Sequence, residues 1–156
     1  MVLLIGYGNT LRRDDGAGVV LTEMFAQGAR REVRAIVTQQ LLPELAEEIA
    51  EPCVKMVIFC DAIQAAGPDD EPVRLKRLVS LPVVTTIGHQ FSPETLMSLA
   101  ERLYGAAPPS WLVTVTGHDF GYGEGLSEKV RSSLAVAEDT LRCLVAEITP
   151  APATAP

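Results

Sequence analysis

Three side chains with metal-binding and acid–base chemistry lie in separate parts of this chain: Asp15, Asp61 and His89. Asp15 lies in a glycine-rich loop after the first apolar segment, Asp61 follows the apolar segment 54–60, and His89 precedes a predicted helix. If the apolar segments are strands of one α/β sheet, these residues meet at its carboxyl edge, where such sheets bind ligands. Two carboxylates and one imidazole would leave coordination positions open on a divalent transition metal.

Each of these residues also has a purely structural interpretation. Asp14 or Asp15 could cap the first helix, and Asp61 could accept hydrogen bonds from backbone amides at the end of its strand. His89 could be a loop histidine bonded to a carbonyl group. The spacing alone therefore leaves metal binding and structural roles both open, and it does not identify a metal.

A competing pair of candidate ligands, His118 and Asp119, follows the predicted strand 111–116 at the same edge of the sheet. We rank this pair second, because an aspartate in such a turn often makes a local hydrogen bond. The neighbouring segment 120–123, Phe-Gly-Tyr-Gly, suggests a loop shaped for packing or for contact with a partner.

Several nucleotide-binding and hydrolase motifs are excluded by the sequence. Gly6 and Gly8 begin a dinucleotide-binding motif, but Leu11 stands at the third glycine position and no acidic residue follows the second predicted strand after Val37. The predicted helix also begins too late for Gly8 to place a pyrophosphate at its N-terminus. The sequence contains no P-loop and no serine in a nucleophile elbow.

The cysteines are interpreted as structural. Cys60, beside Asp61 and with His89 downstream, could be a nucleophile, but consecutive strand residues point to opposite faces. If Asp61 faces a cleft, Cys60 faces the core. The odd number and wide spacing of Cys53, Cys60 and Cys143 predict reduced core thiols in a cytoplasmic protein.

Length and charge restrict the class of protein further. A chain of 156 residues is long enough for one domain with its own core. The net charge of −7 is spread along the chain and argues against a nucleic acid partner. No apolar run has the length of a membrane span and no signal peptide is recognisable, so we expect no membrane association.

The order of apolar segments predicts an α/β fold. Strands are expected at 2–5, 33–37, 54–60, 73–79 and 111–116, and helices at about 15–28, 42–49, 92–105 and from 127 to a stop at Pro150. The continuously apolar segment 54–60 is expected to be the central strand, and 73–79 an edge strand. We therefore predict one three-layer domain, residues 1–148, with a mainly parallel sheet of about five strands and helices on both faces. Residues 149–156 are expected to be a disordered tail.

The motifs together resemble the [NiFe]-hydrogenase maturation endopeptidases. The resemblance rests on Gly6-x-Gly8-Asn9-x-Leu11-x-x-Asp14-Asp15-Gly16-x-Gly18, on Asp61-Ala62 after an apolar strand, and on His89-Gln90 before a helix, in order from Met1 to about Glu147. The segment 40–47, Gln-Leu-Leu-Pro-Glu-Leu-Ala-Glu, further resembles the branch that serves soluble, cofactor-reducing hydrogenases. Two departures are that some relatives have glutamate at the place of Asp15, and that Gly117-His118-Asp119-Phe120 replaces a glycine-valine-x-proline sequence.

The resemblance implies a phosphorylase- or hydrolase-like fold and a nickel-dependent endopeptidase. Its substrate would be a hydrogenase large-subunit precursor, whose C-terminal extension is removed after nickel insertion. Asp15, Asp61 and His89 would contact the nickel, which arrives with the precursor, and zinc or cadmium could replace it in a crystal. Whether the metal takes part in cleavage, or only identifies the substrate while Asp15 or Asp61 acts as base, is left open.

Two other classes of function agree with the same residues. One is a metal-sensing chaperone of hydrogenase assembly that binds the precursor without cutting it. The other is a small-molecule hydrolase of similar topology, which would turn over its substrate without a partner protein.

Overall fold

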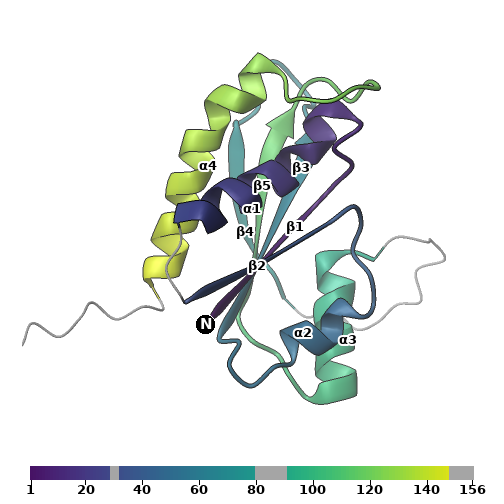
Figure 1. Ribbon diagram of the computed structural model, residues 1–156, viewed down its shortest axis with the longest axis vertical. Coiled ribbons are helices and arrows are strands. Elements are labelled where there is room, and N and C mark those ends of the chain that lie inside the picture. The colour runs from purple at the N-terminus through teal and green to yellow at the C-terminus, as the bar shows by residue number, and fades with distance from the viewer. Residues whose placement is uncertain (29–31, 80–90, 148–156) are drawn as a thin grey trace, which may run out of the picture.

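The computed structural model describes residues 1–28, 32–79 and 91–147 and has a five-stranded sheet between two layers of helices (Figure 1). The strands are β1 (Val2–Tyr7), β2 (Val33–Thr38), β3 (Met56–Gln64), β4 (Val73–Arg77) and β5 (Ser110–Gly117). The helices are the 3-10 helix η1 (Arg13–Gly16) and the α-helices α1 (Ala17–Gly28), α2 (Leu45–Ile49), α3 (Pro93–Tyr104) and α4 (Glu128–Ala146). The predicted three-layer α/β class is confirmed.

The strand order, β2-β1-β3-β5-β4, places β3 at the centre of the sheet. Among the strands that the structure describes, only β4 is antiparallel to its neighbour, and it lies at one edge, as expected from the mixture of apolar and basic residues along it. The first five residues of β3, Met56 to Cys60, are all buried, because helices cover both faces of the sheet at this strand. The predictions of the central strand and of the edge strand are therefore confirmed.

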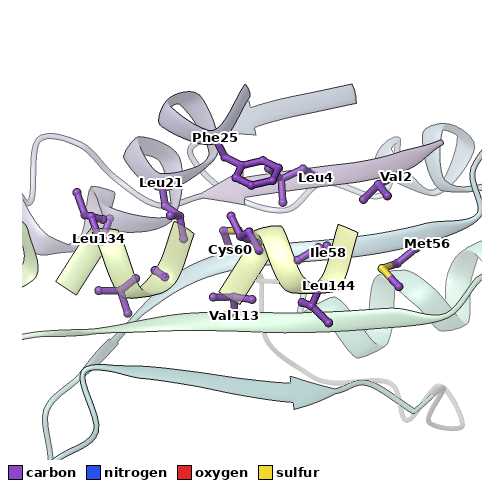
Figure 2. Close-up of a cluster of buried hydrophobic side chains, with 14 of the residues drawn as sticks. Val2, Leu4, Leu21, Phe25, Met56, Ile58, Cys60, Val113, Leu134 and Leu144 are labelled. Carbon is purple, nitrogen blue, oxygen red and sulfur yellow. The ribbon is translucent and has the colours of Figure 1, made fainter. Parts of the chain in front are cut away.

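Two apolar clusters form the core, one on each face of the sheet. In the first cluster, side chains of β1, β3 and β5 pack against α1 and α4; Figure 2 shows Leu4, Ile58 and Val113 among Leu21 and Leu134 of these helices. In the second cluster, alternate residues of the same strands pack against α2 and α3. The two-residue alternation along each strand thus divides the core between the layers.

The chain changes direction across the sheet between β1 and β3. From β1 it passes through α1 to β2 at the edge, and it then returns through α2, on the opposite face, to β3 on the other side of β1. In open α/β sheets, ligands bind at the carboxyl ends of neighbouring strands whose loops leave in opposite directions. The topology therefore predicts a ligand site after β1 and β3.

The central strand extends further than the sequence predicts. β3 does not end before Asp61 but continues to Gln64, and this last part pairs with β5 up to Gly117. Its pairing with β1 stops earlier, at Gly6 and Cys60. Asp61 therefore lies in the part of β3 that pairs with β5 on one side and no longer pairs with β1 on the other.

Helix α2 is shorter than predicted, since it begins at Leu45 rather than at residue 42. Before it, the amides of Leu45 and Ala46 donate to the carbonyl groups of Leu42 and Pro43, three residues earlier. These bonds form a tight turn rather than an α-helical turn, which explains the shift of the helix start.

Two of the three cysteines are not core residues. Cys53 and Cys143 are exposed and only Cys60 is buried, so the prediction of core thiols was wrong for two positions. Cys143 lies between Leu141 and Leu144, which occupy the buried face of α4, and helical geometry turns it to solvent. Apolar neighbours in sequence therefore did not indicate burial.

The predicted tail and the predicted helix stop at Pro150 lie outside the described residues. Within the described part of the chain, the structure contains no helix with the length and apolarity needed to cross a membrane.

Candidate active site

The glycine-rich loop after β1 is held against the end of β3 by close backbone contacts. A Cβ atom on Gly18, in the first turn of α1, would lie 2.2 Å from the carbonyl oxygen of Cys60, so only glycine permits this approach. Gly8 has a φ of 139°, and a Cβ atom there would lie 1.9 Å from the carbonyl oxygen of Asp15. The loop therefore folds back on itself and brings Asp15 to the end of the central strand.

Asp15 lies at the carboxyl edge of the sheet, as predicted, and is half-buried. Its carboxylate accepts a hydrogen bond of 2.9 Å from the backbone amide of Asn9, within the same loop. Its charge acts on Asp61, where it contributes to a raised pKa. The structure thus brings Asp15 and Asp61, which are 46 positions apart in the sequence, into one electrostatic environment.

Asp61 is a carboxyl group with an unusually high pKa. Burial raises its pKa to about 6 and the charge of Asp15 acts in the same direction, whereas hydrogen bonds from Tyr7 and from the amide of Ala62 oppose the shift. The amide of Ala62 donates at 2.7 Å. Burial and the repulsion between like charges both disfavour the ionised form of the two carboxylates. A cation placed between them would reduce this electrostatic cost. The donor set therefore suits a divalent ion.

Tyr7, the last residue of β1, is a member of this site that the sequence analysis missed. Its hydroxyl group hydrogen-bonds to Asp61, and burial together with the charge of Asp61 raises the pKa of Tyr7 far above its usual value. The charge of Glu94, in the first turn of α3, also acts on Tyr7. The sequence placed Tyr7 in the loop after the predicted strand 2–5, whereas β1 extends to Tyr7, and the strand register that places it beside Asp61 is not visible in the sequence.

Asp14 has a different environment from its neighbour Asp15. It is fully buried, and its carboxylate accepts four hydrogen bonds from the loop after β5: the amides of His118, Asp119 and Ser127 at 2.8, 2.8 and 2.7 Å, and the hydroxyl of Ser127 at 2.8 Å. Burial alone would raise the pKa of Asp14, but these bonds outweigh it and lower the pKa below its ordinary value.

Neither aspartate caps the first helix. Arg12 occupies the N-cap position of η1, and no side chain there accepts a capping hydrogen bond. The capping interpretation of Asp14 and Asp15 was therefore wrong. Each carboxylate has a partner outside the helix start, Asp14 in a distant loop and Asp15 at Asn9.

Backbone pairing reinforces the contact between the two loops. Arg12 forms an isolated parallel bridge with Gly123, whose amide donates to Leu11 and whose carbonyl accepts from Arg13. Arg13 has a φ of 48°, rare for a residue with a side chain, and its guanidinium group pairs with Asp119 at 3.3 Å. The loop after β1, which carries Asp15, and the loop after β5 are thus joined into one structural unit.

The competing pair His118 and Asp119 has structural partners in this unit. Asp119 accepts a local hydrogen bond of 3.0 Å from Gly121, as predicted for a turn, and it also pairs with Arg13. His118 is exposed, and its backbone amide donates to Asp14. These contacts explain the positions of both residues without a metal.

Cys60 faces the core, as predicted from strand alternation. It is fully buried in the cluster with α1 and α4, and burial raises the pKa of its thiol to about 12. A thiol that is neither ionised nor accessible is a poor nucleophile. Cys60 is therefore a packing residue.

The third predicted ligand, His89, lies outside the described residues. Among the residues that the structure describes, no three side chains of histidine, cysteine, aspartate or glutamate are close enough to bind one metal ion. Asp15 and Asp61 are brought together, and the complete ligand set with His89 stays a prediction.

Comparison with solved structures identifies proteins of the same fold. The hydrogenase maturating endopeptidase HybD from Escherichia coli superimposes with a TM-score of 0.71 over 94% of this chain and 92% of its own, at 24% identity. The [NiFe] hydrogenase maturation protease HybD from Thermococcus kodakarensis gives a TM-score of 0.69 over 92% and 97%, at 17% identity. HycI from Thermococcus kodakarensis KOD1 gives 0.67 over 94% and 90%, at 22% identity.

These matches cover at least 90% of each chain. No protein-family model and no curated protein matched the sequence significantly. The chain therefore has the α/β fold of the hydrogenase maturation proteases, the fold expected from the motifs around Asp15, Asp61 and His89.

Proposed function

We propose that this protein is a cytoplasmic endopeptidase that removes the C-terminal extension of a [NiFe]-hydrogenase large-subunit precursor after nickel insertion. The observation that carries the proposal is the pair of carboxylates, Asp15 and Asp61, at the carboxyl edge of the sheet in a fold shared with hydrogenase maturation proteases. The fold supplies the class of reaction, and the carboxylate pair supplies a place for it.

The chemistry of the pair supports hydrolysis that depends on a metal carried by the substrate. Asp15 and Asp61 offer oxygen ligands, and His89 would offer a nitrogen ligand, to nickel that the precursor already holds. A divalent ion can polarise a carbonyl group or make a bound water more acidic. A carboxylate that does not bind the ion at that moment can accept a proton from water. The buried Cys60 offers no competing nucleophile.

The position of α3 supports the inclusion of His89 in the proposal. Glu94, five residues after His89 in the sequence, lies close enough to Tyr7 for its charge to raise the pKa of the phenol. The start of α3 therefore lies near the same edge of the sheet as Asp61, which supports a ligand role for the histidine that precedes this helix in the sequence.

The test compares cleavage of a nickel-loaded precursor with cleavage of the same precursor without metal, by mass spectrometry. We expect one shortened product from the loaded precursor only. Replacement His89→Ala should abolish cleavage, because it removes the proposed nitrogen ligand. The matched control is His118→Ala, at the other histidine of the chain, which should retain cleavage because His118 is outside the proposed ligand set.

Other outcomes would point to the alternative functions. Binding of the loaded precursor without shortening would favour a metal-sensing chaperone. Turnover of small esters or amides, with no effect on the precursor, would favour a small-molecule hydrolase. Equal cleavage of the loaded and metal-free precursor would contradict the nickel dependence.

A further inference from the structure

We infer that Tyr7 is a positioning residue of this site, whose hydroxyl group orients the Asp61 carboxylate for the reaction. The inference rests on the proposed function and concerns a residue of β1 that carries none of the expected ligand chemistry. It follows from the strand register, from the alternation of side chains and from the hydrogen bonds that reach Asp61.

The register of β1 and β3 places the two residues side by side. These strands are parallel, and their last pair is Gly6 with Cys60. One step further along both strands, beyond the last backbone pair, are Tyr7 and Asp61. Because neighbouring strands lie about 4.8 Å apart where they pair, the side chain of Tyr7 is long enough to reach the Asp61 carboxylate just beyond that pair.

Side-chain alternation turns both residues to the same face. A Cβ atom on Gly6 would meet Thr22 of α1, and Cys60 is buried in the cluster with α1 and α4. The next residue on each strand therefore points to the opposite face. The ring of Tyr7 packs there against the apolar cluster that includes α2 and α3, which holds the ring while its hydroxyl group reaches Asp61.

Two donors restrict the Asp61 carboxylate. The amide of Ala62 donates to Oδ1 at 2.7 Å, and the Tyr7 hydroxyl supplies the second hydrogen bond. The hydrogen bond from Ala62 comes from the next residue of the same strand and fixes one oxygen of the carboxylate. The bond from the neighbouring strand ties the carboxylate to the rest of the sheet, so that its orientation is determined by β1 as well as by β3.

A phenol is suited to this role because it is a neutral donor at pH 7. Lysine or arginine in its place would form an ion pair with Asp61 and would reduce the attraction of the carboxylate pair for a cation. Tyrosine orients the carboxylate and leaves its charge available. Groups that orient the ligands of a metal in this way typically affect affinity or activity by about 10- to 100-fold.

The test is the substitution Tyr7→Phe, which removes the hydroxyl group and keeps the packed ring. Its matched control is Tyr104→Phe, at the half-exposed C-terminal end of α3. With the nickel-loaded precursor, we expect Tyr7→Phe to lower kcat about tenfold and to leave KM within about twofold, because orientation acts on the reaction rather than on docking. Tyr104→Phe should change neither constant.

A second measurement uses the free protein and needs no activity. In protein labelled with ¹³C at the aspartate carboxyl carbons, the Asp61 resonance is identified by its loss in Asp61→Asn. We expect this resonance to move in Tyr7→Phe and to stay in place in Tyr104→Phe, because of these two tyrosines Tyr7 is the one that hydrogen-bonds to Asp61.

The outcomes separate this inference from the proposed function. If the wild-type protein cleaves the precursor and Tyr7→Phe cleaves it equally fast, the inference is wrong and the proposed function stands. An unchanged Asp61 resonance in Tyr7→Phe also overturns the inference. If the wild-type protein cleaves no precursor, the proposed function fails and the inference fails with it.

Discussion

Asp14 and Asp61 lie at the same edge of the sheet and are treated in opposite ways by the structure. Asp14 accepts four hydrogen bonds from the loop after β5, and these bonds lower its pKa despite its complete burial. Asp61 receives two hydrogen bonds and lies near the charge of Asp15, and burial raises its pKa to about 6. One carboxylate has its full set of partners, whereas the other is left partly uncompensated.

The difference in hydrogen bonding assigns the two aspartates different roles, Asp14 in stability and Asp61 in the proposed activity. A buried carboxylate with four hydrogen bonds stabilises the folded chain and has little capacity left for a ligand. A carboxylate that is buried with few partners costs stability and keeps its capacity to bind a cation or a proton. Asp14 therefore belongs to the framework that holds Asp15 in place, and Asp61 belongs to the proposed chemistry.

The largest expected effect is the loss of cleavage activity in the variant Asp61→Asn. We expect cleavage of the nickel-loaded precursor to fall at least about a hundredfold, because the amide neither accepts a proton nor binds a divalent ion as strongly. Circular dichroism should show an intact fold. Asp139→Asn, an exposed position on α4, is the control and should be fully active. Full activity of Asp61→Asn would remove this residue from the mechanism.

The next effect is on stability by Asp14→Asn. The amide of asparagine can accept only part of the four hydrogen bonds, and its NH2 group would face the backbone amide donors. We therefore expect the free energy of unfolding, measured in urea, to fall by about 2 to 4 kcal/mol. The same variant should still cleave at low temperature, where it is folded. A loss of activity without a loss of stability would reverse the roles that we assign to Asp14 and Asp61.

A smaller loss of stability is expected for Ser127→Ala. Ser127 caps α4 through the amide of Val130 and donates its hydroxyl to Asp14, so its removal should cost about 1 to 2 kcal/mol in urea unfolding. Ser132→Ala, further along α4, is the control and should change stability by less than about 0.5 kcal/mol. Equal effects of the two substitutions would show that the link to Asp14 contributes little.

The smallest expected effect is on the pH dependence of stability, measured in EDTA. The pKa of Asp61 is higher in the folded than in the unfolded chain. The contribution of Asp61 to the free energy of unfolding should therefore decrease as pH rises from about 4 to 6. The pKa of Asp14 is lower in the folded chain, so its contribution should be lost as pH falls below its ordinary value of 3.8. Subtracting the curves of Asp61→Asn and Asp14→Asn from wild type should give slopes of opposite sign, with changes on the order of 1 kcal/mol after solvent screening. Slopes of the same sign would contradict the comparison.

Much of the fold could be predicted because it depends on local patterns. The continuously apolar segment before Asp61 indicated a strand covered on both faces, and the alternation along it placed Cys60 in the core. The alternation of strands and helices along the chain indicated the mainly parallel sheet with helices on both faces. These features depend on residues that are near one another in the sequence.

The partners of the site residues could not be predicted in the same way. Asp14 is bound by Ser127, 113 positions later, and the sequence offered only a local capping role for it. Tyr7 lies beside Asp61 because of the register between β1 and β3, and a shift of one residue would turn the side chains to opposite faces.

The sequence by itself determined the order of strands and helices, the side of the sheet that Cys60 faces, and the edge at which Asp15 and Asp61 lie. These properties follow from the periodicity of apolar residues and from the positions of Asp15 and Asp61 after apolar segments. The tertiary structure alone decided that Asp14 joins two loops, that Asp61 stays short of partners and that Tyr7 touches it. The physical reason is that hydrogen bonding and burial of a carboxylate depend on which distant segments pack around it, and the local sequence does not specify those segments.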